Sequence, residues 1–201
     1  MTVQIGDIYN YNEQEYSCVE RTGYVFDPYD YGLQPSRICT DCIRGYWCEY
    51  EITNNRILLQ SLYIHDADEI YPIINGVSIS SMDHLPALEQ TDEGLDSTEI
   101  PFTYEYETYE HLGLLLPYTG KLLLGIPFLQ YSYFYHSSEC KELLCFEFDN
   151  GELKNVEDYS ETAHTLHKAY KKFGLREFAD DEELYEKLPE GFRKNIWWWY
   201  N

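Results

Sequence analysis

The sequence predicts an α+β fold in which a β-rich body of antiparallel hairpins precedes a helical C-terminal segment. Tyr supplies 21 of the 201 residues and Phe another 9, and aromatic rings suit the half-buried surface of a strand. Apolar and polar residues alternate in short runs before residue 155, whereas later residues show helical spacing. We therefore expect a β-rich domain over 1–155 and a helical segment over 156–201 that packs on it.

The clearest hairpin lies in the first third of the chain. Residues 45–52 alternate between aromatic and polar side chains, and residues 57–64 form a second strand-like run. Asn54 and Asn55 stand between them, and Asn tolerates the positive φ of a tight hairpin turn. The pattern predicts two antiparallel strands joined by a two-residue turn.

A similar pattern returns near the end of the β region. Residues 145–148 lead into Asn150-Gly151, which is a strong signal for a type I′ turn, and Glu152-Leu153 follows. Two interpretations remain open. The likeness fits a body of two pseudo-repeated lobes, and it also fits the same hairpin physics acting twice.

The last quarter of the chain has helical character. Apolar residues recur at helical spacing over 157–173, Lys171 and Lys172 stand near the end of this run, and Gly174 suits a C-cap. Three adjacent tryptophans, Trp197, Trp198 and Trp199, follow near the C-terminus. They cannot all face one way, so the sequence leaves open whether they belong to the core or to an interface.

The charge is strongly negative. Lys and Arg total 14 and Asp and Glu total 36, so the formal net charge is −22. Such a balance repels nucleic acid and anionic membranes and attracts basic partners. Solubility alone, or binding of a cation, would also account for it. We expect a basic protein partner, no direct contact with nucleic acid and no membrane.

The acids are also unevenly placed. The stretch from Ile57 to Gly120 contains no Lys or Arg. Its twelve acidic residues are Asp66, Asp68, Glu69, Asp83, Glu89, Asp92, Glu93, Asp96, Glu99, Glu105, Glu107 and Glu110. This stretch predicts one strongly negative face.

A run of alternating Tyr and Glu inside this stretch is the candidate partner-binding strand. Tyr anchors protein interfaces well, and Glu attracts a cationic partner. The alternative is an edge strand that its acids keep soluble. The residues concerned are Tyr104, Glu105, Tyr106, Glu107, Tyr109 and Glu110.

Several classes of function find no support in the motifs. No Ser-centred nucleophile elbow, P-loop or dinucleotide-binding glycine pattern occurs. Glu105 and Glu107 would face the same side of a strand, which leaves a hydrolase with a Glu pair as a minor alternative. We expect no enzymatic activity and no cofactor.

Cysteine usage and the N-terminus suggest a compartment. Residues 1–6 lack the basic and apolar regions of a signal peptide, and no apolar run is long enough to span a membrane. Six cysteines without such a signal are typical of reduced thiols, so we expect a cytoplasmic protein. Zinc at Cys39, Cys42 and Cys48 stays an open question, because the fourth ligand of a tetrahedral site has no obvious source. We predict no metal.

A short motif precedes the 45–52 strand and has an expected structural role. It contains Cys42, Arg44, Gly45 and Tyr46. We predict that Arg44 is partly buried, pairs with an acid and holds the loop before the strand.

The run from Thr40 to Tyr46 resembles a family of uncharacterised bacterial proteins. That family carries a Thr-x-Cys-Trp-Arg-Gly-Tyr motif, then an aromatic-Glu-Ile strand, an Asn or Asp-Gly turn and a Leu-rich strand; Ile43 stands here where the family has Trp. Residues 118–125 and 146–151 extend the resemblance to roughly 3–155. The chain is also similar to proteins encoded beside bacterial toxins, which implies an immunity role.

These expectations combine into one functional hypothesis. We predict a bacterial, non-enzymatic binding protein, an immunity protein or inhibitor that neutralises a basic effector such as a nuclease toxin. A DNA-mimic inhibitor of a DNA-handling enzyme is the main alternative.

Overall fold

A computed structural model describes residues 4–85, 104–128, 139–165, 167 and 168 of the chain. This part is rich in strands and contains one short α-helix, over residues 160–168. The predicted β-rich character is therefore confirmed, whereas the α+β class and the two pseudo-repeated lobes are not. None of the described helices is both long enough and apolar enough to cross a lipid bilayer.

The chain divides into two compact units, each made from separate segments of the sequence. The small-sheet unit comprises Met1–Ile5, Asp27–Cys48 and Gln60–Gly113. The barrel unit comprises Gly6–Phe26, Glu49–Leu59 and Leu114–Asn201. The predicted helical segment over 156–201 is described only as far as residue 168, so the predicted boundary at residue 155 stays a prediction.

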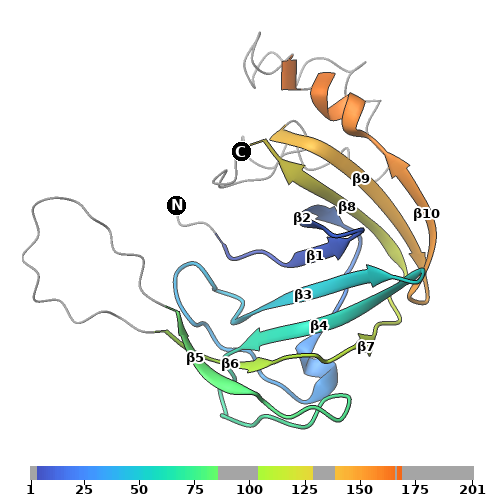
Figure 1. The fold of residues 1–201 in the computed structure, drawn as a ribbon. Coiled ribbons are helices and arrows are strands. Elements are labelled where there is room, and N and C mark those ends of the chain that lie inside the picture. Colours follow the sequence, from blue (N-terminus) through green and yellow to red (C-terminus); the bar gives the residue numbers. More distant parts are fainter. Residues whose placement is uncertain (1–3, 86–103, 129–138, 166, 169–201) are drawn as a thin grey trace, which may run out of the picture. The chain divides into compact units, whose positions relative to one another are not determined.

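Ten strands are found in the described residues (Figure 1). In chain order they are β1 (Ile8–Tyr11), β2 (Gln14–Arg21), β3 (Tyr46–Thr53), β4 (Arg56–Ile64), β5 (Ser81–Leu85), β6 (Tyr104–Tyr109), β7 (Leu114–Leu115), β8 (Gly120–Pro127), β9 (Cys140–Asp149) and β10 (Glu152–Asp158). A short 3-10 helix, η1 (Pro28–Tyr31), lies between β2 and β3.

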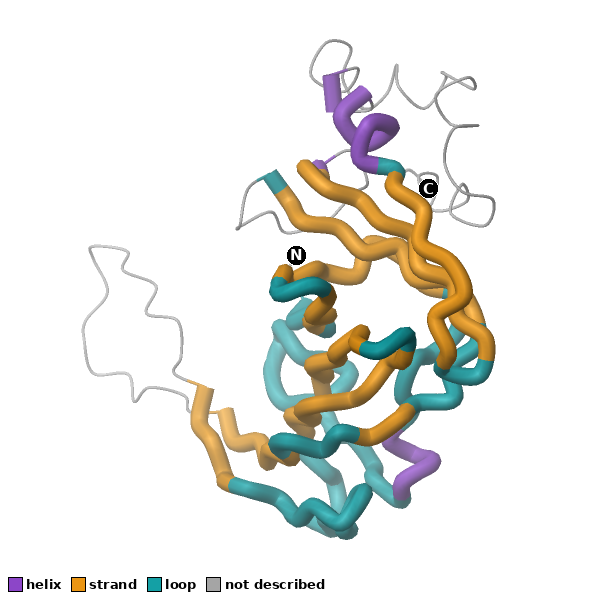
Figure 2. Tube along the Cα trace, turned by 45° about the vertical axis from the view of Figure 1, so that its right-hand side comes forward, coloured by secondary structure: helices purple, strands orange, loops and turns teal. Residues whose placement is uncertain are grey.

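Seven strands of the barrel unit form a closed ring, visible as orange tube in Figure 2. Their order is β10-β9-β8-β2-β1-β3-β4, and β10 pairs with β4 to close it. The closing contacts include the Glu152–Arg56 register pair and a 2.9 Å hydrogen bond from the Leu153 amide to the Asn55 carbonyl. Closure removes the free strand edges that an open sheet exposes.

The tight turns of the barrel agree with the sequence. Asn54 and Asn55 have φ values of 49° and 57°, and Asn150 and Gly151 have 48° and 76°. Both predicted two-residue turns are therefore confirmed. The two similar hairpins are neighbours in the ring, joined through β4 and β10.

Aromatic residues fill much of the barrel core. Tyr9 of β1 stacks on Tyr50 of β3 with ring centroids 4.7 Å apart, and both side chains are buried. Tyr11 meets Phe146 edge-on at 4.9 Å. Fully burying side chains of this size contributes about 1.5–3 kcal/mol each, so these rings are major sources of the barrel's stability.

The short helix packs on the barrel through a second apolar cluster. Ala163 of the helix is buried with Leu123 of β8 and with Leu143 and Cys145 of β9. The helix begins at Ser160, whose amide donates to the Asp158 carboxylate at 2.8 Å. The predicted 157–173 helix begins later than expected, because Glu157 and Asp158 still belong to β10. Its residues 169–173 and the three tryptophans lie outside the described residues.

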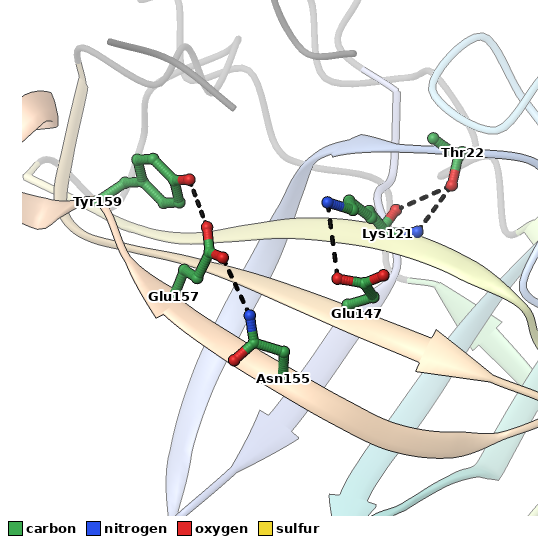
Figure 3. A network of polar contacts seen from close by, with 6 residues as sticks. All are labelled: Thr22, Lys121, Glu147, Asn155, Glu157 and Tyr159. Atoms are coloured by element: carbon green, nitrogen blue, oxygen red, sulfur yellow. Dashed lines mark hydrogen bonds and ion pairs between the residues drawn. The ribbon is translucent and has the colours of Figure 1, made fainter. Parts of the chain in front are cut away.

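Two exposed acids on the barrel strands, Glu147 and Glu157, have a partner of opposite charge or hydrogen-bond donors nearby (Figure 3). Lys121 lies 3.6 Å from Glu147, and Glu157 accepts hydrogen bonds from Asn155 at 3.0 Å and from Tyr159 at 2.5 Å. Surface pairs of this kind contribute about 0–1 kcal/mol each. The Lys121–Glu147 pair balances one negative charge of the barrel, whereas Asn155 and Tyr159 are neutral donors that leave the charge of Glu157 in place.

Candidate protein-binding surface

Strand β6, which carries the predicted Tyr/Glu binding residues, lies inside the small sheet. It pairs with β4 through the Leu62–Tyr109 register and with β5 through the Met82–Glu107 register. Hydrogen bonding on both sides means that β6 is not an edge strand. The alternative interpretation of this run as a soluble edge is therefore wrong.

Burial also corrects the prediction of an accessible binding strand. Tyr109 is fully buried, and Tyr106 and Glu107 expose only 9% and 7% of their surface. Glu110 is exposed, and the backbones of Tyr104 and Glu105 belong to β6, although their side chains lie outside the described part. Three of the six predicted residues thus cannot form an open binding face in this fold.

The reason for the burial of Tyr106 is an aromatic cluster on the small sheet. Trp47 stacks on Tyr63 with centroids 4.7 Å apart, and Tyr106 meets both rings edge-on, at 4.9 and 6.0 Å. Cys39 and Cys42 are buried in the same cluster. Edge-to-face and offset-stacked rings gain energy beyond their buried area, so Tyr106 has a structural role.

The motif before β3 supports this cluster. Gly45 has a φ of 79°, and a Cβ there would lie 2.3 Å from the Ser36 carbonyl oxygen. Arg44 is half-buried, as expected; its Nε donates to the Tyr46 carbonyl at 2.5 Å, and its guanidinium lies 4.7 Å from the Tyr46 ring centre. The expected acid partner of Arg44 stays a prediction. Ile43 is 60% exposed, so packing in the core does not fix its identity.

The cysteines of the small-sheet unit are buried thiols. Cys39 and Cys42 pair through a backbone β-bridge, and both thiols are free. Burial raises the pKa of the Cys42 thiol to about 11. A protonated thiol is a poor nucleophile and a poor metal ligand. Among the described residues no group of three or more His, Cys, Asp or Glu side chains is arranged to hold a metal ion.

A different part of the base-free stretch presents side chains to solvent. We call residues 66–73 the acidic loop. Asp68 and Glu69 are exposed, Ile70 is 60% exposed and Ile73 is 70% exposed. Neither Asp68 nor Glu69 forms an ion pair with the rest of the described chain, in contrast to the balanced acids on the barrel strands.

Asp66 fixes the start of the acidic loop. Its side chain is buried, and its carboxylate accepts hydrogen bonds from the amides of Gln34, of Asp68 at 3.0 Å and of Ile70 at 3.3 Å. A buried carboxylate needs such donors, because burying it without them is costly. Asp66 is therefore a structural residue that holds the loop backbone in one conformation.

The end of the acidic loop is held by two further contacts. The Tyr109 hydroxyl donates to the Pro72 carbonyl at 2.8 Å. Just after the loop, the side-chain amide of Asn75 donates to the Leu112 carbonyl at 2.7 Å. Burial raises the pKa of Tyr109 to about 12, so the hydroxyl keeps its proton at neutral pH and remains a donor. The loop is thus tied down at both ends.

The exposed isoleucines were not predicted as site residues. Their local sequence, Asp-Glu-Ile-Tyr-Pro-Ile over 68–73, contains a signal: two branched apolar residues stand beside Pro72 in a polar turn region. Isolated apolar residues on a surface are common. These two isoleucines differ from isolated ones because hydrogen bonds hold the backbone of their loop, and because the neighbouring Asp68 and Glu69 form no ion pair in the described part of the chain.

Comparisons of this chain with protein-family models, with curated proteins and with solved structures found no match.

Proposed function

We propose that this chain is a non-enzymatic binding protein whose acidic loop docks onto a basic protein, with Ile70 and Ile73 as apolar anchors. The partner would be a basic effector such as a nuclease, which the chain neutralises as an immunity protein or inhibitor. One observation carries the proposal: a loop fixed at both ends exposes two isoleucines beside two carboxylates that form no ion pair within the described part of the chain.

Rigidity supports this role. Ordering a loop when a partner binds costs free energy, and a loop already held in one conformation avoids most of that cost. The Asp66 carboxylate and the Tyr109 hydroxyl provide that order here. Apolar side chains buried at the centre of an interface then supply most of the affinity.

The charge supports a basic partner in particular. A net charge of −22 accelerates encounter with a cationic protein and disfavours nucleic acid. Asp68 and Glu69 would surround the two isoleucines as a polar rim, where they would favour Lys or Arg on the partner. Rim charges of this kind affect the association rate and its salt dependence more than the final affinity.

A capture experiment tests the proposal. The immobilised full chain is incubated with a lysate of its source organism at low salt, washed, and eluted at high salt, where exposed charges are screened. We expect a basic protein to elute from the native chain and to be lost with the double variant Asp68→Lys/Glu69→Lys.

A matched control tests whether the loss of binding depends on the acidic loop or on net charge alone. The double variant Asp149→Lys/Glu161→Lys makes the same change in net charge at two exposed positions of the barrel unit. We expect it to retain most of the capture. Equal loss in both variants would mean that total charge, and not the loop, decides binding. Capture of a DNA-handling enzyme that duplex DNA displaces would favour the DNA-mimic alternative.

A further inference from the structure

An open pocket, called the cavity below, lies at the surface of the barrel unit, beside the turns that follow β1 and β3, and the Asn residues of its lining are exposed. Its volume is about 510 Å³, within the roughly 300–1,000 Å³ usual for small-molecule sites. Its polar lining includes Asn10, Asn12, Glu13, Glu51, Asn54 and Asn55. No Lys or Arg is found among the described residues that line it.

The strand topology explains why these turns lie together. β1 and β3 run parallel, with Asn10 opposite Glu51 and Tyr11 opposite Ile52, and both arrows point the same way in Figure 1. Each strand therefore reaches its hairpin turn at the same end of the pair. Parallel pairing of two strands that each continue into a hairpin brings two turns side by side.

The walls of the cavity are rigid. Asn12 and Asn54 both have a φ of 49°, and the residue after each also has a positive φ, as tight two-residue turns require. The Asn55 carbonyl accepts the barrel-closing hydrogen bond from Leu153. Tyr11, which also lines the cavity, is held edge-on against Phe146. The cavity is thus built from the ordered frame of the barrel.

The chemistry of the lining selects one class of ligand. Asn side chains offer both donors and acceptors, carboxylates offer acceptors, and a Tyr ring offers a flat apolar face. An anion would meet two carboxylates and no base. A cation would use the acceptors and leave the amide donors without a role. Sugar hydroxyls both donate and accept, and a sugar ring has an apolar face that can lie on Tyr11.

We infer that this cavity binds a neutral carbohydrate, of the size of one or two sugar units. The inference rests on the barrel unit alone and is independent of the acidic loop. Direct contacts between the Asn amides and the sugar hydroxyls would give each sugar its orientation, because a side-chain amide both donates and accepts hydrogen bonds.

Ligand-observed NMR tests the inference with the full chain. Saturation transfer is measured for a panel of neutral sugars, namely glucose, galactose, mannose, N-acetylglucosamine, maltose and lactose, each at millimolar concentration. Spermidine and glucuronate serve as the cationic and anionic probes. We expect at least one neutral sugar to receive saturation and neither charged probe to do so.

Variants tie the signal to the cavity. Asn54→Asp keeps a residue that tolerates positive φ but replaces the amide donor with a carboxylate, and we expect it to weaken sugar binding by about tenfold or more. Asn150→Asp is the matched control, because Asn150 has a φ of 48° and does not line the cavity. Circular dichroism and melting curves check that both variants fold.

Three results would overturn the inference. One is the absence of saturation transfer to every neutral sugar in the panel. Another is binding of spermidine that Asn54→Asp strengthens, which would identify a cation site. The third is an equal loss of sugar binding in Asn54→Asp and Asn150→Asp while both remain folded, which would place the sugar elsewhere.

Discussion

The hydroxyl of Tyr109 donates a 2.8 Å hydrogen bond to the carbonyl of Pro72, and so ties a buried strand to the acidic loop. Tyr109 was predicted to contact a partner itself. In the fold it is fully buried and positions the residues that we propose make that contact. The strand contributes to the candidate surface through support of the loop and not through its own exposure.

Removing that hydroxyl should loosen the loop without unfolding the protein. For Tyr109→Phe we expect a loss of about 1 kcal/mol in unfolding free energy, typical of one hydrogen bond. The amides of Ile70, Tyr71 and Ile73 should exchange hydrogen faster, and capture of the partner should weaken. If these amides exchange in Tyr109→Phe at the same rates as in the unsubstituted protein, the hydrogen bond does not order the loop.

Asp66 gives a stronger version of the same test. Asp66→Asn keeps the size of the side chain but replaces one acceptor oxygen with a donor that faces backbone amides. We expect a loss of about 1–3 kcal/mol, from the buried donors left without an acceptor. Chemical denaturation measures it. A change below about 0.5 kcal/mol, typical of surface substitutions, would contradict the role assigned to this carboxylate.

Two glycines with the same φ allow the cost of a positive φ to be distinguished from the cost of a steric clash between a new Cβ and the backbone. Gly45 and Gly32 both have a φ of 79°, but a Cβ meets nothing within 4 Å at Gly32 and the Ser36 backbone at Gly45. Gly32→Ala should cost about 1–2 kcal/mol from its φ alone. Gly45→Ala should lower the melting temperature considerably more. Equal effects of the two substitutions would mean that the Ser36 backbone can move away from a Cβ at position 45 at little cost in stability.

Stability should fall in alkaline solution because of the buried thiols. Burial raises the pKa of Cys140 to about 12 and that of Cys145 to about 11. An unfolded thiol loses its proton near about pH 8.5, so above that pH the unfolded chain binds fewer protons and stability declines. This contribution is complete below about pH 8.5 and is lost as pH rises toward the folded values.

Melting curves between about pH 8 and pH 10 test this, because over that range these two thiols ionise in the unfolded chain and stay protonated in the folded chain. We expect a steady fall in melting temperature, and a smaller fall in Cys140→Ala measured over the same range. An identical pH dependence in the variant would show that Cys140 contributes nothing to it.

Local features of the fold could be predicted from the sequence. The turns at Asn54-Asn55 and Asn150-Gly151 depend on residues that tolerate positive φ, which is a property of the dipeptide itself. A helix in the predicted region is also found, although it begins at Ser160 because Glu157 and Asp158 still belong to β10. The half-burial of Arg44 follows from its small and aromatic neighbours.

Nonlocal pairing could not be predicted in this way. Closure of the barrel requires β4 and β10 to meet, although about a hundred residues separate them, and the parallel β1–β3 pair has no local signal. The Tyr/Glu alternation of β6 looked like a surface because one side of such a strand is acidic. Instead β6 pairs with both β4 and β5, and Tyr106 packs in the aromatic cluster. The isoleucines that we propose as anchors lie in the acidic loop.

Hydrogen exchange of the full chain, with and without the captured basic partner, tests the central claim most directly. We predict that the partner slows exchange at the amides of residues 67–71 and 73–76 and that the Ile70→Ser/Ile73→Ser variant loses both the protection and the binding. Protection confined to the barrel strands, or full binding by the variant, would contradict the account of the acidic loop as the docking surface.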